Sequence, residues 1–336
     1  LQAQHERVQA SGNARGLGAG YLFSLEDYPR KDQNKEHLVI AVSHNIIAES
    51  PETSGAGNEG KFYTCRLEVM DSSQQYRSER ITPAIFCHSP YPCGSKTLKA
   101  AKAAARELGA PFLVHVAETR GEAGMIAEAE GRSPIRYLDQ LGLLDEGTLL
   151  VHAVWLDGPD IQCIAASGAS VAHCPESNMK LASGVMPLPD LRSAGIDVGL
   201  GTDGCASNND LDLFGEMNTT AKLHKVMCQN PTVATAHEVF AMATSQGARA
   251  LGRDDEIGSI VKGKLADLVR VDVHTPCLTP MYDPISHLVY AARGGDVRDV
   301  MVGGSWVVRD RQILTFDPAP VMAQARAVAA QILTRG

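Results

Sequence analysis

The sequence predicts an α/β fold in which parallel strands form a barrel, and two observations carry this prediction. From residue 80 onward, short runs that are apolar on both faces alternate with helical segments, as is typical of parallel strands buried between layers. Each run ends in polar, chemically capable residues. Barrel enzymes build their sites from the carboxyl ends of many strands, whereas a doubly wound sheet gathers ligands mainly at one switch point, so a barrel is favoured. The expected strands lie within residues 81–90, 111–119, 147–156, 168–177 and 196–204.

Helical segments separate these strands. Residues 95–109, "SKTLKAAKAAARELG", are rich in Ala, Lys and Arg and end in glycine, which predicts a helix. The stretches "PDIQCIAASG" and "PLPDLRSAG" fill later gaps in the same way. We expect two further helices over 211–228 and 235–251.

The pattern changes after residue 255. Residues 263–273 and 296–314 alternate apolar and polar side chains, and the second stretch contains a Gly-Gly turn, so we expect antiparallel strands of a small appended sheet. An Ala- and Val-rich helix is expected over 318–334. The first 80 residues carry fewer signals, with strands expected at 14–24 and 37–45.

Composition limits the partners and the compartment. The formal net charge is −8, and Lys and Arg are not clustered, which argues against a nucleic acid partner. No apolar run approaches the roughly 20 residues of a membrane span, so we expect no membrane partner. The eight cysteines include no C-x-x-C pair, which predicts reduced thiols in a cytoplasmic protein.

One pair of polar residues at a strand end predicts a hydrolytic metal site. In "PFLVHVAETRGE", His115 lies three places before Glu118, where the expected strand gives way to a loop. The imidazole can bind a metal ion while the carboxylate reaches a water molecule on that ion. Such a water still needs a nearby base to carry its proton onward, and Glu118 fits that role.

Other strand ends offer further candidates. Asp203, in "GLGTDG", would add an oxygen ligand to imidazole nitrogen, a mixture that suits zinc or ferrous iron. The alternative is an ordinary turn aspartate before glycine. His152 and His88 are expected to contact the water or the substrate, or else to bond to the backbone at their strand ends. For His173 a structural role is the favoured interpretation.

Seven stretches occur in a fixed order between residues 80 and 314: "FCHSPYPC", "LVHVAETRGE", "LVHAVWLD", "VAHCPESNMKLASGVMPLPDL", "VGLGTDGCASNNDLDLFGEM", "IGSIVKGKLADLVRVD" and "DVRDVMVGGSWVVRD". In this order the sequence resembles the amidohydrolase superfamily, in its branch of zinc deaminases and chlorohydrolases. Its closest resemblance is to the 5-methylthioadenosine/S-adenosylhomocysteine deaminases. The succession of "HCPESNMKLASG" and "GTDGCASNNDLDL" is highly specific for that group.

The resemblance implies a (β/α)8 TIM-type barrel with a small β-sandwich. On this basis we expect a barrel over residues 1–255, a sandwich portion over 256–316 and a C-terminal helix over 317–336. It also implies site roles. His115 and Asp203 would be metal ligands, Glu118, His152 and Asp203 would be catalytic, and His88 with Glu118 would contact the substrate.

The sequence departs from the family at one place. The family has an H-x-H pair on its first barrel strand, which supplies two metal ligands, and these 336 residues contain no H-x-H. By strand count, residues 14–24 resemble the third barrel strand, so the first strands are expected to be missing from this chain. His44 cannot replace two ligands. We therefore expect incomplete metal occupancy in this chain, which is either truncated or a member that has lost the metal.

The leading functional interpretation is hydrolytic deamination of an adenine-type nucleoside, such as 5-methylthioadenosine or S-adenosylhomocysteine, by metal-activated water. The alternatives are a chlorohydrolase or deaminase of another heterocycle, such as a triazine or guanine, and an inactive, metal-free binding module. The expected partner is a small-molecule substrate, with a homo-oligomer left open. Zinc is the expected cofactor, with ferrous iron as the alternative.

Overall fold

A computed structural model describes residues 8–12, 22–46, 63–71 and 82–333. The chain forms two compact units, residues 1–82 and 83–336. Within the described residues, no helix combines the length and the apolar character that a membrane span requires. The seven cysteines whose side chains are described are free thiols.

The first unit is an antiparallel sheet with the strand order β1-β4-β3-β2. Its small core comprises Val39, Leu67 and Val69. We expected residues 14–24 to form a barrel strand, but residues 22–24 instead form an antiparallel pair with β3, and residues 14–21 lie outside the described part. The expected strand at 37–45 lies within β3. The strands are β1 (Val8–Gly12), β2 (Leu22–Ser24), β3 (Glu36–Ile46) and β4 (Tyr63–Asp71).

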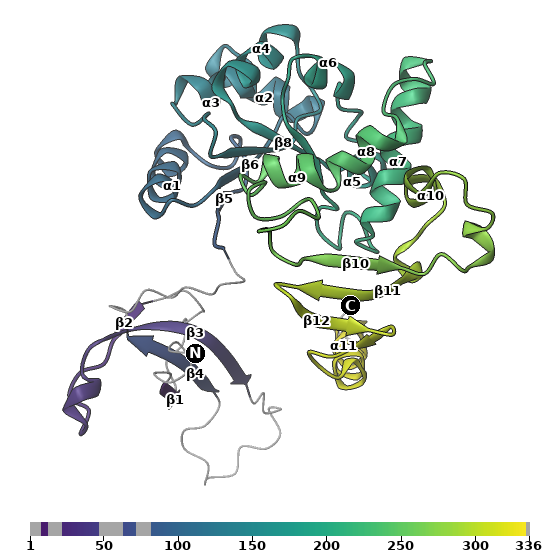
Figure 1. The fold of residues 1–336 in the computed structure, drawn as a ribbon. Coiled ribbons are helices and arrows are strands. Elements are labelled where there is room, and N and C mark those ends of the chain that lie inside the picture. Colours follow the sequence, from purple (N-terminus) through teal and green to yellow (C-terminus); the bar gives the residue numbers. More distant parts are fainter. Residues whose placement is uncertain (1–7, 13–21, 47–62, 72–81, 334–336) are drawn as a thin grey trace. The chain divides into compact units, whose positions relative to one another are not determined.

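The second unit is built on five parallel strands that follow one another in chain order, β5-β6-β7-β8-β9 (Figure 1). All five expected strands are present, and they supply five of the eight strands of the expected barrel. Parallel pairing brings the carboxyl ends of the strands to one edge. The strands are β5 (Ile85–Cys87), β6 (Phe112–Val116), β7 (Thr148–His152), β8 (Ser170–His173) and β9 (Val198–Leu200).

Helices connect these strands, and capping residues fix where several of them begin. Thr119, Ser133 and Asp157 each accept a backbone N–H of the first turn of a helix. Gly109 ends the first helix with a φ of 60°, a conformation that favours glycine. The helices are α1 (Ser95–Leu108), α2 (Arg120–Glu130), α3 (Pro134–Gln140), α4 (Gly158–Ser167), α5 (Pro175–Lys180), α6 (Leu188–Ser193), α7 (Leu213–Cys228), α8 (Ala236–Met242) and α9 (Ser245–Ala250).

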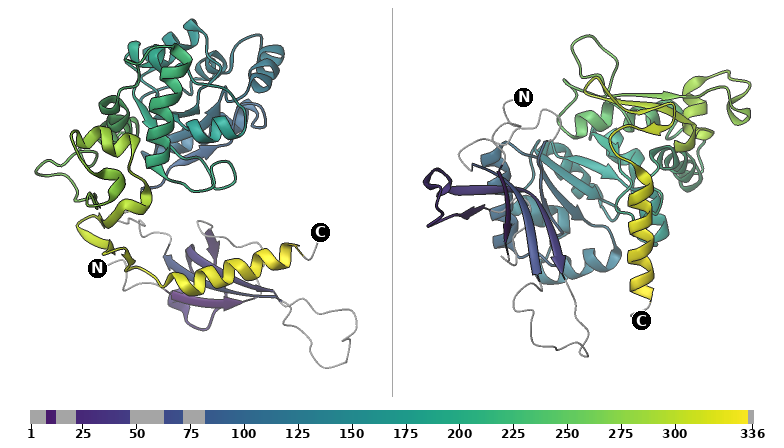
Figure 2. Two further views of the ribbon diagram at one scale, coloured as in Figure 1. Left: turned by 90° about the vertical axis from the view of Figure 1, so that its right-hand side faces the viewer. Right: turned by 90° about the horizontal axis from the view of Figure 1, so that it is seen from below.

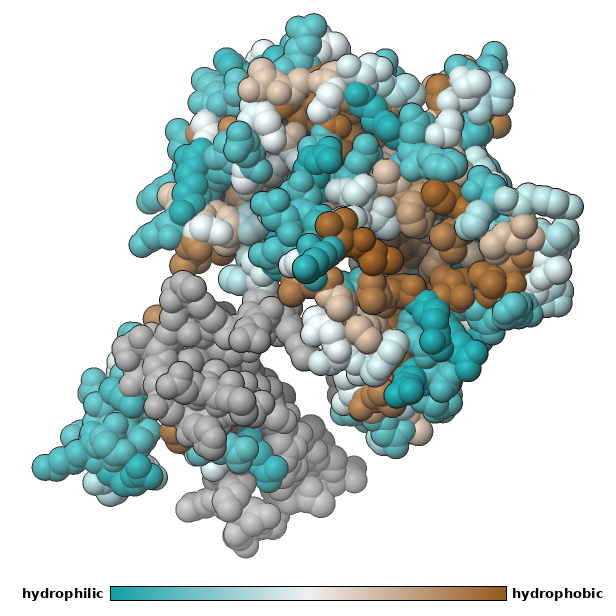
Figure 3. Space-filling model, in the orientation of Figure 1, coloured by the Kyte–Doolittle hydropathy of each residue, from teal (hydrophilic) through white to brown (hydrophobic). Residues whose placement is uncertain are grey.

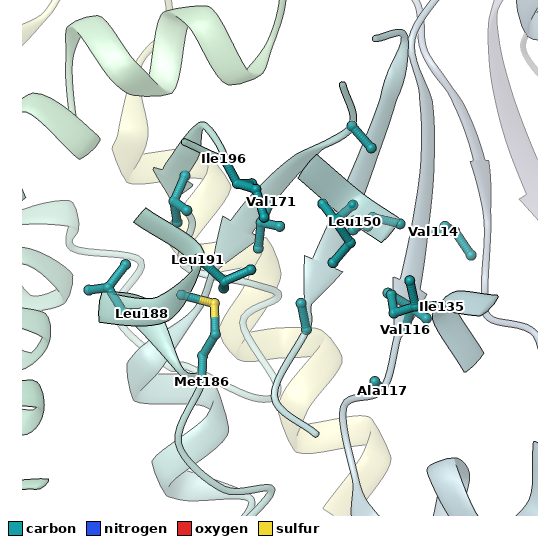
Figure 4. Packing of buried hydrophobic residues seen from close by; sticks show 14 of the residues in the cluster. Val114, Val116, Ala117, Ile135, Leu150, Val171, Met186, Leu188, Leu191 and Ile196 are labelled. Carbon is teal, nitrogen blue, oxygen red and sulfur yellow. The ribbon is translucent and has the colours of Figure 1, made fainter. Parts of the chain in front are cut away.

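The core lies between the parallel sheet and its helices (Figure 4). The register of the strands places Val114, Leu150, Val171 and Val198 in one row across the sheet. All four are buried, and helix residues such as Ile135 and Leu191 belong to the same cluster. This row joins β6, β7, β8 and β9, so the side chains at their carboxyl ends are positioned by a packed layer.

The appended sheet is antiparallel, in the order β10-β11-β12-β13. Gly303 and Gly304 form the expected turn between β11 and β12, with φ values of 52° and 76°. These described strands form one layer. Apolar side chains are exposed where β10 lies (Figure 3), and Leu268 and Val269 of this strand are among the exposed residues. The strands are β10 (Leu268–Val271), β11 (Val297–Val302), β12 (Ser305–Arg309) and β13 (Gln312–Ile313).

The boundary expected near residue 255 does not separate compact units, because the chain packs against the helices α7 and α8 again after β10. Helix α10 (Pro284–Tyr290) packs on α7 and α8, and its Val289 is fully buried in the main core. The side chain of Asn218 on α7 donates hydrogen bonds to the carbonyls of Val289 and Tyr290. The expected closing helix is present as α11 (Pro318–Leu333), which extends away from the appended sheet (Figure 2). Its side chains are mostly exposed.

Candidate active site

Three of the predicted residues meet at the carboxyl edge of the parallel sheet. His115 on β6, His152 on β7 and Asp203 after β9 each offer a ligand atom, and these atoms lie within 4.8 Å of one another. The three residues are separated by up to 88 positions in the sequence, so only the parallel arrangement brings them together. Two imidazoles and a carboxylate form a donor set that suits zinc or ferrous iron.

The backbone is strained where these side chains leave the strands. His152 has a φ of 74° and Asp203 a φ of 60°, both in the left-handed region that non-glycine residues rarely adopt. Ala117, just before Glu118, has a φ of 49°. Strain of this kind costs about 1–3 kcal/mol per residue and clusters at functional sites. The surrounding contacts must therefore hold these residues in place.

The carbonyl of His88 orients the ring of His115. His115 Nδ1 donates to that oxygen at 2.7 Å, which leaves Nε2 free to bind a metal ion. Burial is the main cause that lowers the pKa of His115, and the neighbouring His152 adds to it. A lowered pKa keeps the imidazole neutral, as a metal ligand must be.

Asn178 orients His152 in the same way. The ring of His152 is buried, and its Nδ1 lies 2.9 Å from Asn178 Oδ1. An amide oxygen only accepts, so Nδ1 is the protonated nitrogen and Nε2 carries the lone pair. That Nε2 lies 3.8 Å from Glu118 Oε2, on the side of the other two candidate ligands.

Two serines hold the carboxylate of Asp203. Ser177 Oγ and Ser207 Oγ donate to Asp203 Oδ2 at 2.7 and 2.8 Å. Burial on its own raises the pKa of Asp203, but these hydrogen bonds and the backbone N–H of Gly204 outweigh it, so the pKa is lowered overall. Asp203 is therefore ionised at neutral pH, and its Oδ1 is available to a ligand.

Glu118 is a partly exposed acid of the site. Its carboxylate accepts from Ser183 Oγ at 3.3 Å, and a quarter of its side chain is exposed. The backbone N–H groups of Ala117 and Glu118 donate to the buried carboxylate of Glu122, at 3.2 and 2.9 Å. Glu118 thus projects from a loop whose backbone is fixed.

The remaining histidines take different positions. The ring of His88 is exposed, with its centroid 5.1 Å from that of His115, so it lies beside the site. His173 is fully buried and lies outside the candidate ligand group. Its Nε2 is 3.0 Å from His224 Nε2 on α7, in agreement with the structural interpretation. His44 lies on β3 in the other unit, and its side chain is not described.

Five residues that contact this site were not predicted from the sequence: Ser177, Asn178, Ser183, Ser207 and Glu122. The first three lie in "HCPESNMKLASG", immediately after β8. Their position after a parallel strand was a usable signal, because every other strand end had already supplied a candidate. Glu122 has a weaker signal, since Thr119-x-x-Glu122 is also a common helix-capping pattern.

A model of the amidohydrolase family matches residues 14–307 of the chain. A 5-methylthioadenosine/S-adenosylhomocysteine deaminase of Syntrophobacter fumaroxidans is 46% identical over 249 residues, which cover 74% of this chain and 57% of that protein. A 5'-deoxyadenosine deaminase of Methanothermobacter thermautotrophicus is 44% identical over 313 residues, which cover 93% of this chain and 71% of that protein. The chain thus spans little more than half the length of the first relative.

Solved structures resemble the chain over a similar share. An adenosine deaminase from Xanthomonas campestris with bound zinc has a TM-score of 0.73 and 39% identity, over 75% of this chain and 57% of that one. An atrazine chlorohydrolase from Arthrobacter aurescens, complexed with zinc, has a TM-score of 0.68 and 26% identity, over 75% and 57%.

Proposed function

The chain belongs to the amidohydrolase family, and from this premise we propose that it catalyses the hydrolytic deamination of an adenine-type nucleoside. The observation that carries the proposal is the convergence of His115, His152 and Asp203, with Glu118 beside them. The relatives named above are deaminases of adenine nucleosides, which supports this substrate class. The expected small-molecule substrate follows from it.

The donor set fits a divalent metal ion, and we propose zinc, with ferrous iron as the alternative. His115 and Asp203 would hold the ion, and the position of His152 makes it a candidate third ligand. Both histidines direct Nδ1 to a fixed acceptor and so leave Nε2 for the ion. When bound, the metal lowers the pKa of a water molecule from about 15.7 towards roughly 7.

The side chains of the site divide the proton chemistry between them. The attacking water adds to the carbon that bears the amino group, and ammonia leaves. Glu118 takes a proton from this water and passes it to a ring nitrogen of the substrate. His152 orients the water, and the free oxygen of Asp203 takes its second proton and passes it to the amino group, which leaves as ammonia. His88, exposed beside His115, is the proposed substrate contact.

The runner-up proposal is hydrolysis of another heterocycle, because the same attack serves any suitable leaving group. The chlorohydrolase neighbour supports this alternative, although its identity to the chain is lower than that of the deaminases. A binding module without catalysis is the third candidate. A cytoplasmic location and a possible homo-oligomer stay predictions.

The test is ammonia release by the zinc-loaded chain from 5-methylthioadenosine, S-adenosylhomocysteine and 5'-deoxyadenosine, with chloride release from a chlorotriazine as the second arm. Glu118→Gln should lower deamination by about 10²–10⁴-fold, because it removes the proton carrier. Glu128→Gln, an exposed position on α2, is the matched control and should match the wild type.

The outcomes separate the three candidates. Chloride without ammonia would favour the chlorohydrolase. Neither product from zinc-loaded protein would reject both enzymes and favour the binding module. A Glu118→Gln variant that keeps wild-type turnover would show that this glutamate is not the proton carrier.

A further inference from the structure

One short segment contacts three functional side chains of the site. Residues 177–183, which comprise the last four residues of helix α5 and the turn after it, lie between β8 and α6. From this segment Ser177 reaches Asp203, Asn178 reaches His152 and Ser183 reaches Glu118. The three contacting residues are buried, with exposed fractions of 0, 1 and 3%.

We propose that residues 177–183, named here the positioning segment, set the orientation of the site: they fix the tautomer of His152, one oxygen of Asp203 and the rotamer of Glu118. The proposal rests on the proposed function, because it assigns these contacts to a metal-dependent hydrolytic site. None of the three residues touches the reacting atoms, so each is a positioning residue.

Asn178 makes the most specific of the three contacts. Its Oδ1 accepts from His152 Nδ1, which requires Nε2 to present a lone pair towards the candidate ligand group. The amide Nδ2 is buried and has no hydrogen-bond partner among the described residues. Burial of Nδ2 without a partner costs desolvation free energy. This cost is consistent with a side-chain position that is set by the contact of Oδ1 with His152.

The segment is itself held firmly. The N–H of Asn178 donates to the carbonyl of Cys174, and the N–H of Ser183 donates to the carbonyl of Asn178 at 2.8 Å. Trp155 Nε1 donates to the carbonyl of Ser183 at 2.7 Å. Because Trp155 follows β7 three residues after His152, the strand that carries the histidine also fixes the end of the segment that orients it.

The first experiment tests the His152 contact on the zinc-free full chain. Ring ¹⁵N chemical shifts, at a pH where the imidazole is neutral, distinguish a protonated nitrogen from one with a lone pair. The wild type should show His152 with Nδ1–H. Asn178→Ala should lose this preference, whereas Asn178→Asp should keep it, because a carboxylate also accepts. Asn230→Ala removes an amide that caps a turn elsewhere and serves as the control.

Zinc affinity, measured by calorimetry, is the second readout. Loss of a partner that orients a metal ligand typically weakens binding 10–100-fold, so Asn178→Ala should fall in that range and Asn178→Asp should stay near the wild type. Ser177→Ala should also weaken zinc binding, since it frees Asp203. Ser183→Ala should leave the zinc affinity unchanged, because Glu118 lies outside the ligand group.

An Nε2–H tautomer in the wild type, or an Asn178→Ala variant with wild-type tautomer and zinc affinity, would overturn the proposal. Circular dichroism confirms that each variant folds. The tautomer is read without metal or substrate, so a chain that releases no ammonia rejects the proposed function without deciding this inference. Conversely, a wrong tautomer rejects the inference while deamination still stands.

Discussion

The carboxylate of Glu122 accepts the backbone N–H of Glu118, with 2.9 Å between Glu122 Oε2 and that nitrogen. Its other oxygen accepts the N–H of Ala117, whose φ is 49°. Burial is the main cause that raises the pKa of Glu122, which is only 3% exposed. The buried Glu122 thus stabilises the strained backbone at Ala117, from which the partly exposed Glu118 projects.

Glu122→Ala should therefore be strongly destabilising. It leaves two backbone N–H groups without their acceptor, and each unsatisfied buried donor costs about 1–3 kcal/mol. Glu122→Gln should lose less, because its single carbonyl oxygen still accepts one of the two. Urea denaturation measures both, with Glu128→Ala on the exposed face of α2 as control. An unfolding free energy for Glu122→Ala equal to that of the control would contradict the role.

The sequence predicted the strands that carry the site, because each has a local signal in its apolar run and its polar end. It therefore identified His115, His152 and Asp203, which the structure brings together. The positions of Asn178 and Glu122 carried a signal, but their partners did not follow from it, since the contacts depend on the rotation of α5 and on the turn at Ala117. Neither leaves a periodic pattern in the sequence.

Long-range packing accounts for the other differences between the fold predicted from the sequence and the observed fold. Residues 256–316 look like a separate part because their strands alternate in polarity. Yet Val289 returns to the main core, an event that residue pattern alone does not encode. In the first unit, an apolar strand such as residues 37–45 is compatible with either parallel or antiparallel pairing, and the structure makes it antiparallel.

Zinc should stabilise the folded chain through His115 and Asp203. At free zinc 100 times the Kd, a ligand that binds only the native state adds about 2.7 kcal/mol to the unfolding free energy. His115→Ala should abolish this gain, whereas Glu118→Gln should keep it, because the glutamate is not in the ligand group. Thermal unfolding with zinc and with a chelator measures the gain. His237→Ala, exposed on α8, is the control. A His115→Ala variant with the full zinc shift would rule out this residue as a ligand.

Glu216 should make stability depend on pH. Burial is the main cause that raises its pKa from 4.5 to about 8, and repulsion from Glu176 and Asp210 raises it further. The hydrogen bonds from the backbone N–H of Glu176 and the amide of Asn208 lower the pKa, but by less. The folded chain thus holds this proton more tightly than the unfolded chain does. The resulting stabilisation is complete below the unfolded pKa and is lost as the pH rises through about 8, at up to about 1.4 kcal/mol per pH unit.

Glu216→Gln removes this titration, so its unfolding free energy should fall less between about pH 5 and pH 8 than that of the wild type. Loss of one hydrogen bond lowers the whole curve, so the slope, and not the absolute value, is the quantity to compare. Denaturant titrations at several pH values provide it. Glu107→Gln, exposed on α1, should parallel the wild type. Equal slopes for Glu216→Gln and the wild type would show that Glu216 titrates normally.

Gly184→Ala should disturb the end of the positioning segment. A Cβ there would lie 2.8 Å from Val154 Cγ1 and 3.2 Å from Trp155 Cζ2, and the φ of 131° is one that side chains rarely adopt. Gly195→Ala is a matched control, because its φ of 77° is also positive but nothing lies within 4 Å of the new Cβ. The control should show the backbone cost, about 1–3 kcal/mol, and Gly184→Ala a further 1–3 kcal/mol from overpacking. Urea unfolding gives both values, and the indole of Trp155 reports its own environment by fluorescence. Equal losses in the two variants, with unchanged Trp155 fluorescence, would mean that the contact between this glycine and Trp155 does not hold the segment.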